Sequence, residues 1–587
     1  MNRIVDISAW GRRWLTIGAI LFVPAAMFGQ CDLTWNGSFS NDWSTPANWT
    51  PNGAPTSSTN ICIDNPGQTA TAAGVNSAAA NLTITSNSTL NFVSGSLGIN
   101  GATVSNSGTL KVANSFLGFL TATTLNGGGA IELSQIGTSS IAIGSSAALT
   151  NSDNTIEGYG NLVPVTSTSA FTNGVNGIVN ANSQGLTLNV QGFGFGTLAN
   201  QGTMEATNGG KLTLGGVVFG TSSSSSVNNV GGTILASGQG SEVDISGYIQ
   251  GGTLKTTGSG SIVVTGPHGS GGPTLIWDGT GNSGGLFNAG NLNVGSSDVL
   301  LQSGNLQNTG SMLLNSSSQV QFVNAGLSGN GSITLADGST MTVLVGAIVN
   351  DGNTIVLDGG AGGNSNPTNR SSSLNYEQNS GEFDLQTGAS VHGGIGINGG
   401  TAIIDGVITG TLGAGTNFSG ELEGTGIISG RLLDDGIVHP GDSTGMLTLN
   451  GNYQQDGTGI FDVDIGGLSD FSELMVNGSA SLDGSLDVSL ADGYTPNLGD
   501  TFTILDSETL SGTFAELNGL DEGNVVFDIV YKPDSVELVV VSTTAPEPGT
   551  WLLSAGSLIA AFLARLNCPR IINRGSGRGP GSAGHAI

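Results

Sequence analysis

The sequence predicts an all-β protein: a parallel β-helix (solenoid), followed by a β-rich C-terminal region and a single C-terminal apolar helix. Short runs that alternate apolar and polar residues, such as 82–85, 211–214 and 332–335, are typical of strands. A turn motif containing Asn and Gly recurs between these runs. Gly supplies 99 of the 587 residues without a three-residue period, which excludes collagen.

Residues 1–29 have the order of a secretory signal peptide. Arg12 and Arg13 end a basic region, Leu15 to Phe28 form an apolar core, and Gly29 offers a small residue for cleavage. We therefore expect the remainder of the chain to be exported.

Residues 31–69 form a tryptophan-rich segment with Trp35, Trp43 and Trp49 close together. This pattern resembles the opening of secreted β-solenoid proteins. One interpretation is a cap that covers the first strand edge, which would otherwise pair with other chains. The other is a platform on which sugars stack. Both are kept as hypotheses, and the cap is favoured.

Three cysteines are present, and two of them flank this segment. Disulfides form in oxidising compartments, so in an exported protein we expect Cys31 and Cys62 to be joined. Cys568 stands alone near the end, and no cysteine spacing indicates zinc.

Residues 70–430 are predicted to form the repeats of the β-helix. The turn motif has Asn two residues before Gly, at spacings that fit one or two units of about 20–30 residues. Its clearest copies begin at Asn106, Asn200, Asn229, Asn288, Asn308 and Asn350. Units of this size cannot bury a core alone, so they stack, and the stacked Asn side chains are expected to form hydrogen-bonded ladders.

The sequence of these repeats also resembles known families. Residues 149–158, Leu-Thr-Asn-Ser-Asp-Asn-Thr-Ile-Glu-Gly, are similar to the repeats of haemagglutinin-type and autotransporter-like passengers. Within a predicted β region at 431–542, residues 439–514 resemble the autotransporter-associated β region, on the stretches 440–449 and 490–496. The resemblance implies a surface-located β-solenoid.

The end of the chain has three parts. Pro546, Glu547 and Pro548 precede an apolar run at 551–564, and Arg565 follows it. As a helix the run would span about 21 Å, less than the ~30 Å hydrocarbon core, which fits transient membrane insertion.

This order resembles the PEP-CTERM sorting signal of bacterial envelope proteins, here at 545–570. The resemblance implies an exosortase-type sorting enzyme as partner and removal of the tail. A plain C-terminal anchor helix is the alternative. A disordered Gly/Arg-rich tail is expected at 571–587.

The charge distribution excludes some partners. Of 42 acidic and 13 basic residues, 41 acidic but only six basic ones lie between Asp32 and Glu547. A body without a basic surface does not bind nucleic acid phosphates, but it attracts cations.

Several segments contain residue types that are used in catalysis or metal binding. Residues 441–445, Gly-Asp-Ser-Thr-Gly, match a nucleophile elbow with His439 nearby, but strands on both sides indicate a turn. Two carboxylates suffice for a glycosidase, and the candidates are the pairs 434–435 and 462/464. Scattered Ca²⁺ binding is open at the acids of 434–435, 462–464, 470–473 and 521–522, without an assigned metal site or any cofactor.

Taken together, we expect a non-enzymatic protein of the cell envelope, outer surface or extracellular matrix of a Gram-negative bacterium. Its expected partners are the sorting enzyme and polysaccharide or other surface polymers, and it would act as an adhesin or matrix component. The alternative is a β-helical carbohydrate-active enzyme, a glycosidase or lyase.

Overall fold

A computed structural model describes most of residues 31–543 and divides the chain into two compact units. Unit 1 comprises Met1–Thr334 with Leu344–Gly346, and unit 2 comprises Leu335–Val343 with Ala347–Ile587. Within 31–543, the residues outside the description are 135–138, 195–196, 217–224, 265–274, 280–285, 296–297, 317, 337–338, 346–347, 358–361, 364–373 and 410–418.

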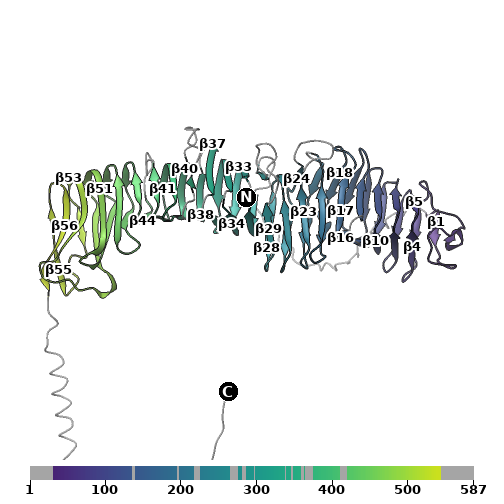
Figure 1. Cartoon of the computed structure of the whole chain (residues 1–587), viewed down its shortest axis with the longest axis horizontal. Helices are drawn as coiled ribbons and strands as arrows, with labels where there is room; N and C mark the ends of the chain where they lie inside the picture. The colour runs from purple at the N-terminus through teal and green to yellow at the C-terminus, as the bar shows by residue number, and fades with distance from the viewer. Residues whose placement is uncertain are drawn as a thin grey trace, which may run out of the picture. The chain divides into compact units, whose positions relative to one another are not determined.

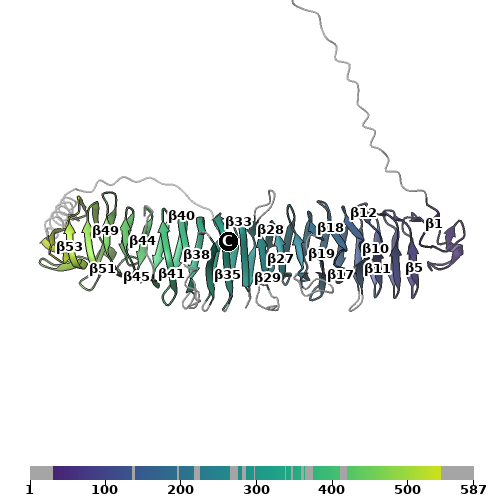
Figure 2. The same cartoon turned by 90° about the horizontal axis from the view of Figure 1, so that it is seen from above.

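Unit 1 is built from strands that pair in parallel with the strand three places later in the chain, so that one coil contains three strands (Figures 1 and 2). The coils thus form three columns of parallel strands. The first column contains β3 (Ile61–Ile63), β6 (Leu82–Ile84), β9 (Thr103–Asn106), β12 (Thr123–Asn126), β15 (Ala148–Asn151), β18 (Ala170–Asn173), β21 (Leu198–Asn200), β24 (Ser226–Asn228), β27 (Gly247–Gln250) and β30 (Leu275–Asp278).

The other two columns follow the same rule. The second contains β4 (Thr69–Ala73), β7 (Thr89–Val93), β10 (Thr109–Ala113), β13 (Ala130–Ser134), β16 (Thr155–Gly158), β19 (Ile178–Ala181), β22 (Thr203–Ala206), β25 (Thr233–Ser237), β28 (Gly252–Thr257) and β31 (Leu286–Ala289). The third contains β5 (Asn76–Ala79), β8 (Ser96–Ile99), β11 (Phe116–Phe119), β14 (Ser140–Ile143), β17 (Gly160–Pro164), β20 (Thr187–Gln191), β23 (Lys211–Gly215), β26 (Glu242–Ile245), β29 (Ser261–Val264), β32 (Asn291–Val294), β34 (Ser311–Leu314) and β36 (Ser332–Leu335). Two longer strands, β33 (Asp298–Asn308) and β35 (Gln319–Ser328), each span the first and second columns.

The N-terminal end of unit 1 departs from this pattern. Strand β1 (Leu33–Trp35) pairs in parallel with β3 on one side and antiparallel with β2 (Trp49–Thr50) on the other. A 3-10 helix, η1 (Pro46–Asn48), leads into β2. The first edge of the column is therefore covered by an antiparallel pair.

Alternation along the strands separates the core from the surface. In β10, for example, Leu110 and Val112 are buried while Thr109 and Lys111 are partly exposed. Successive strand residues point to opposite faces, so the period-two runs of the sequence become one apolar and one polar face. The alternating runs predicted to be strands are therefore strands with one buried face, which confirms the strand prediction.

A buried ladder of asparagine side chains occupies the corner after the first column. Asn151, Asn173, Asn200 and Asn229 are all buried, and each donates its Nδ2 to the Oδ1 of the next at 3.0, 2.9 and 2.8 Å. At the corner after the second column, Asn288 donates to Asn308 in the same way at 2.9 Å. A Cβ at Gly177 would lie 2.4 Å from Asn173 Oδ1, so this corner needs glycine. The predicted ladder is confirmed.

Unit 2 is also built on parallel columns. One contains β38 (Ile348–Leu357), β40 (Leu374–Leu385), β42 (Thr401–Ile404), β44 (Glu421–Gly424), β47 (Ile437–Pro440), β50 (Ile460–Gly467), β52 (Ser485–Leu490) and β54 (Glu516–Asn518). Another contains β37 (Thr340–Val345), β39 (Gly362–Gly363), β41 (Ser390–Ile397), β43 (Val407–Thr409), β45 (Ile427–Ser429), β48 (Gly445–Asn450), β51 (Asp470–Leu482) and β53 (Thr501–Gly512). Strands β46 (Leu432–Asp434) and β49 (Tyr453–Gln455) pair in parallel, and β49 also pairs in parallel with β51.

The C-terminal end of unit 2 is antiparallel. Strands β55 (Val525–Tyr531) and β56 (Ser535–Thr543) form a hairpin, and β56 pairs antiparallel with β53. A second 3-10 helix, η2 (Ala491–Gly493), follows β52.

The described residues thus form an all-β structure whose long parallel sheets are consistent with a β-helix. Apart from η1 and η2, the described part of the chain contains no helix. The apolar helix predicted at 551–564 lies outside the described residues.

Candidate functional site

The sorting residues Pro546, Glu547, Pro548 and Arg565 lie outside the described residues, as does the signal peptide at 1–29. Where the chain is described, it has no helix of sufficient length and apolar character to cross a membrane.

The N-terminal tryptophans are buried rather than displayed. Trp35, Trp43 and Trp49 are at most 1% exposed. Trp49 packs edge-on against both others, with ring centroids 5.0 and 4.9 Å apart, and its Nε1 donates to the carbonyl of Trp43 at 2.8 Å. A sugar platform needs an exposed ring face, so the platform hypothesis is wrong for these residues. Their packing is that of a small core beneath the antiparallel end.

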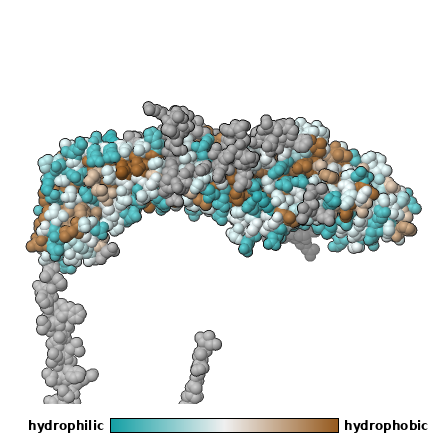
Figure 3. Space-filling model, viewed as in Figure 1, coloured by the Kyte–Doolittle hydropathy of each residue, from teal (hydrophilic) through white to brown (hydrophobic). Residues whose placement is uncertain are grey.

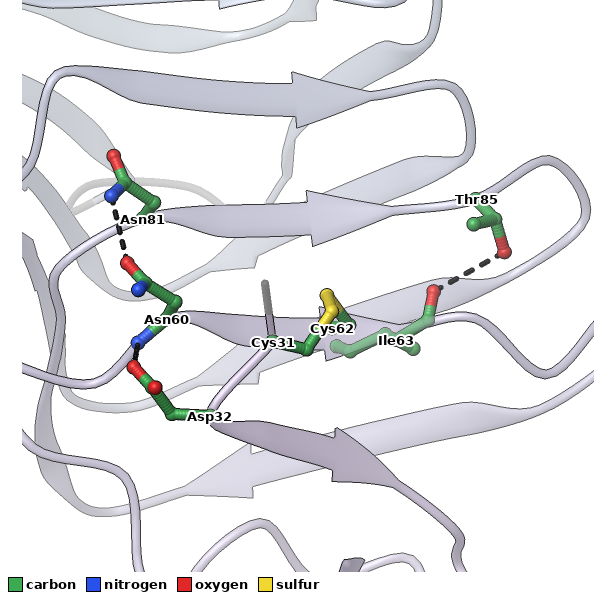
Figure 4. The surroundings of a disulfide bond; sticks show 7 residues. All are labelled: Cys31, Asp32, Asn60, Cys62, Ile63, Asn81 and Thr85. Atoms are coloured by element: carbon green, nitrogen blue, oxygen red, sulfur yellow. Dashed lines mark hydrogen bonds between the residues drawn. A yellow bond between two sulfur atoms is a disulfide. The ribbon is translucent and has the colours of Figure 1, made fainter. Parts of the chain in front are cut away.

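A disulfide joins Cys31 to Cys62 at this end (Figure 4), with their Cα atoms 5.7 Å apart. Beside it, Asp32 Oδ2 accepts a hydrogen bond from the backbone N–H of Asn60 at 2.8 Å. The bridge therefore ties the start of the described chain to β3, the first strand of the first column.

The 441–445 motif forms a turn between the strands β47 and β48, as its flanking sequence predicted. Ser443 Oγ donates to Asp464 Oδ2 at 3.2 Å. His439 Nε2 lies 3.5 Å from the same carboxylate oxygen and 3.2 Å from the carbonyl oxygen of Ser443. Serine, histidine and an acid therefore do lie together, a grouping that sequence spacing did not predict.

The order of these contacts differs from that of a catalytic triad. In a triad the imidazole accepts the serine proton and the acid orients the imidazole. Here the Ser443 hydroxyl is bonded to Asp464 directly, and the imidazole faces a backbone carbonyl. Ser489 also donates to Asp464, and Thr444 donates to Asp470. The bonds of Ser443 and Thr444 hold the turn against β50 and the start of β51, and the bond of Ser489 joins β52 to β50.

A row of titratable side chains crosses the outer face of this column. Glu423 on β44 is in register with His439 on β47, and Asp462 on β50 is in register with Asp487 on β52. Asp462 and Asp464 are alternate residues of β50 and share a face, as expected. We call Glu423, His439, Asp462 and Asp487 the acidic row.

Burial is the main electrostatic effect in the acidic row. It raises the pKa of Asp462, and Asp464 and Asp487 raise it further, whereas His439 lowers it. Burial also raises the pKa of Glu423, with Glu421 adding to the effect. Among the described residues, no group of three or more His, Cys, Asp or Glu side chains is arranged to hold a metal ion.

The pair Asp434 and Asp435 does not form the two-carboxylate site considered from the sequence. Asp434 is fully buried, and it accepts hydrogen bonds from the Tyr453 hydroxyl at 2.8 Å and from the Gly436 N–H at 3.0 Å. Asp435 is partly exposed. Neighbouring residues at a strand end point in opposite directions, so the two carboxylates cannot act on one substrate.

The remaining acidic segments take structural roles. Asp470 lies at the antiparallel turn between β50 and β51 and accepts the Thr444 hydroxyl. Asp521 accepts the N–H of Gly523 at 3.0 Å within a surface turn.

The fold and these sites define an all-β protein with parallel columns, antiparallel pairs at both ends and an outward acidic row. A family described as a domain of unknown function, DUF8693, matches residues 34–139. This segment contains the tryptophan core and the strands from β2 to β13. No curated protein matches the chain.

Proposed function

We propose that this chain is a non-enzymatic, exported protein of the cell surface or exopolysaccharide matrix, sorted by its C-terminal PEP-CTERM-like signal. The signal peptide at 1–29 and the order Pro546-Glu547-Pro548, apolar run and Arg565 support the route. The observation that supports polymer binding is the repetition of polar side chains along the columns.

That repetition is exact over several coils. On the second column Thr69, Thr89 and Thr109 are in register, and further along so are Thr203, Thr233 and Thr253. Neighbouring strands lie about 4.8 Å apart, so the same hydroxyl is offered again at each coil. A polymer that repeats its own hydroxyl groups can make many weak contacts with such a row, and these gain through multivalency.

The surface is compatible with a hydrated polymer rather than with an apolar partner. On the face drawn in Figure 3, most residues are hydrophilic or neutral, and hydrophobic ones occur in separate groups. The excess of acidic residues would repel anionic surfaces unless cations bridge them.

The sorting proposal is tested by deleting 546–587 and following the location and mass of the protein in cell fractions. The full chain should reach the envelope and lose the mass of its tail, and the deletion should change both. Deleting only 571–587, which leaves Pro546 to Arg570 intact, is the matched control and should behave as the full chain. Unchanged location and mass after the longer deletion would refute the sorting proposal.

One observation favours the second candidate, a glycosidase. Asp462 and Asp487 are in register on adjacent strands, and a spacing of about 4.8 Å is close to the ~5 Å between the carboxylates of retaining glycosidases. We expect the full chain to release no reducing sugar from envelope polysaccharide. Release that is lost in Asp462→Asn would establish the enzyme instead.

A further inference from the structure

A buried acid replaces an amide at one corner of unit 2. Asp434 ends β46, and the register pairs it with Gln455, which ends β49 one coil later. Both side chains flank Gly459: a Cβ there would lie 3.2 Å from Asp434 Cγ and 2.8 Å from Gln455 Cγ. Asp434 and Gln455 are thus stacked neighbours inside a column, one coil apart, as Asn173 and Asn200 are in unit 1.

Gln455 has an acceptor without a donor. Its Nε2 donates to the carbonyls of Gly459 and Ser485, both at 2.9 Å. Its Oε1 is buried and has no hydrogen-bond partner in the described structure. A buried acceptor left unpaired is unfavourable, and an ionised carboxylate has no proton to give it.

We propose that Asp434 is a protonated carboxylic acid in the folded chain and donates its hydrogen to Gln455 Oε1, which makes this pair a pH-sensitive hydrogen bond in the core of unit 2. The direction agrees with the ladder of unit 1, where Asn173 donates to Asn200, one coil later. Asp434 likewise precedes Gln455 by one coil, so its O–H takes the place of an amide N–H.

The groups around Asp434 favour the neutral form. The pKa of Asp434 is raised to about 7, mainly by burial; the nearby acids Asp435 and Asp456 also raise it, whereas the hydrogen bonds from Tyr453 and Gly436 lower it. Burial also raises the pKa of Tyr453 well above its usual value, so its hydroxyl stays a donor. In the next coil Asp483 lies near Gly457, and it too is acidic.

The pH dependence has a defined sign. The folded state binds the proton more tightly than the unfolded state, whose aspartate ionises near pH 4. The stabilisation is therefore complete below about pH 4 and is lost as the pH rises toward and past 7. Above pH 7 the carboxylate is an anion beside an unpaired amide oxygen, and the pairing of β46 with β49 should loosen.

Infrared difference spectroscopy of the full chain tests the proton directly. The carbonyl band of a protonated carboxylic acid should be present at pH 5.5, disappear around pH 7, and be missing from Asp434→Asn. Asp435→Asn, which changes the adjacent outward acid, is the matched control and should keep the band. A band that persists unchanged in Asp434→Asn, or a wild-type chain without one, would overturn the proposal.

Hydrogen exchange of peptides covering 432–456 tests the consequence. After correction for the intrinsic pH dependence of amide exchange, protection in the wild type should fall roughly tenfold between pH 6 and 8.5, from a folded pKa of about 7. In Asp434→Asn, which has no proton to lose, protection should stay constant. An equal fall in both proteins would refute the switch.

Discussion

Replacing Asn173 by alanine should destabilise unit 1 more than any change of an outward asparagine. Asn173 is fully buried. Its Nδ2 contacts Asn200 Oδ1 at 2.9 Å and the carbonyls of Gly177 and Thr203 at 3.0 Å, and its Oδ1 accepts from Asn151 at 3.0 Å. One substitution therefore interrupts the ladder on both sides.

The magnitude follows from the groups left behind. Asn151 retains a bond to the carbonyl of Asn154 at 2.8 Å, so it stays partly satisfied. Asn200 Oδ1 loses its donor, and a buried unpaired acceptor costs about 1–3 kcal/mol. The space vacated by the amide adds a cavity term. We expect a total loss of about 2–4 kcal/mol in the free energy of unfolding.

Asn189→Ala is the matched control. Asn189 donates to Asn161 Oδ1 at 3.1 Å on the outer face of the third column, where water can replace the bond. Its loss should cost under about 1 kcal/mol. Urea unfolding followed by tryptophan fluorescence reports on unit 1, which holds Trp35, Trp43 and Trp49. Equal losses for the two variants would refute the idea that the buried ladder carries the stability.

Three further changes test the N-terminal end of unit 1 and the turn at 441–445. Reducing the disulfide, or replacing Cys31 and Cys62 by serine, should lower the stability of unit 1 by roughly 3–4 kcal/mol, because the bridge spans 31 residues; no shift in the urea midpoint on reduction would contradict this. Trp43→Ala should cost about 3–5 kcal/mol in thermal unfolding but leave polysaccharide binding intact, and loss of binding by a folded variant would contradict the burial of the ring. Ser443→Ala removes one partly exposed hydrogen bond and should change the free energy of unfolding by under about 1 kcal/mol; an ester-hydrolysing activity that vanished in this variant would show Ser443 to be a nucleophile.

The strands and the ladder were predictable because they depend on local periodicity. Residues 211–214 form part of β23 and 332–335 form β36, since an alternating run has only one way to bury its apolar face. The asparagine motif predicted the ladder for a similar reason. An asparagine repeated at the same corner of successive coils, as at Asn151, Asn173 and Asn200, meets its own copies.

Contacts between outward side chains were not predictable in the same way. His439 and Asp464 meet although 25 residues separate them, and the coils of this chain differ in length, so spacing alone does not align them. The pair Asp434–Asp435 shows the same limit. Composition makes the two acids equivalent, and only the register of β46 against β49 places Asp434 inside.

The small number of basic side chains explains why buried carboxylates such as Asp434 have no positively charged partner among the described residues. Lys111 pairs with Glu132 at 2.8 Å, and Lys211 pairs with Glu242 at 2.7 Å and with Asp244 at 3.3 Å. Six basic residues cannot neutralise 41 acids in this way. Most carboxylates must therefore stay on the surface, where water and salt screen their repulsion. Neither screening nor a basic partner is available to a buried carboxylate such as Asp434. A bound proton is then the remaining means of removing its charge, which explains why the one fully buried acid among the candidate carboxylates is also the one whose pKa rises to about 7.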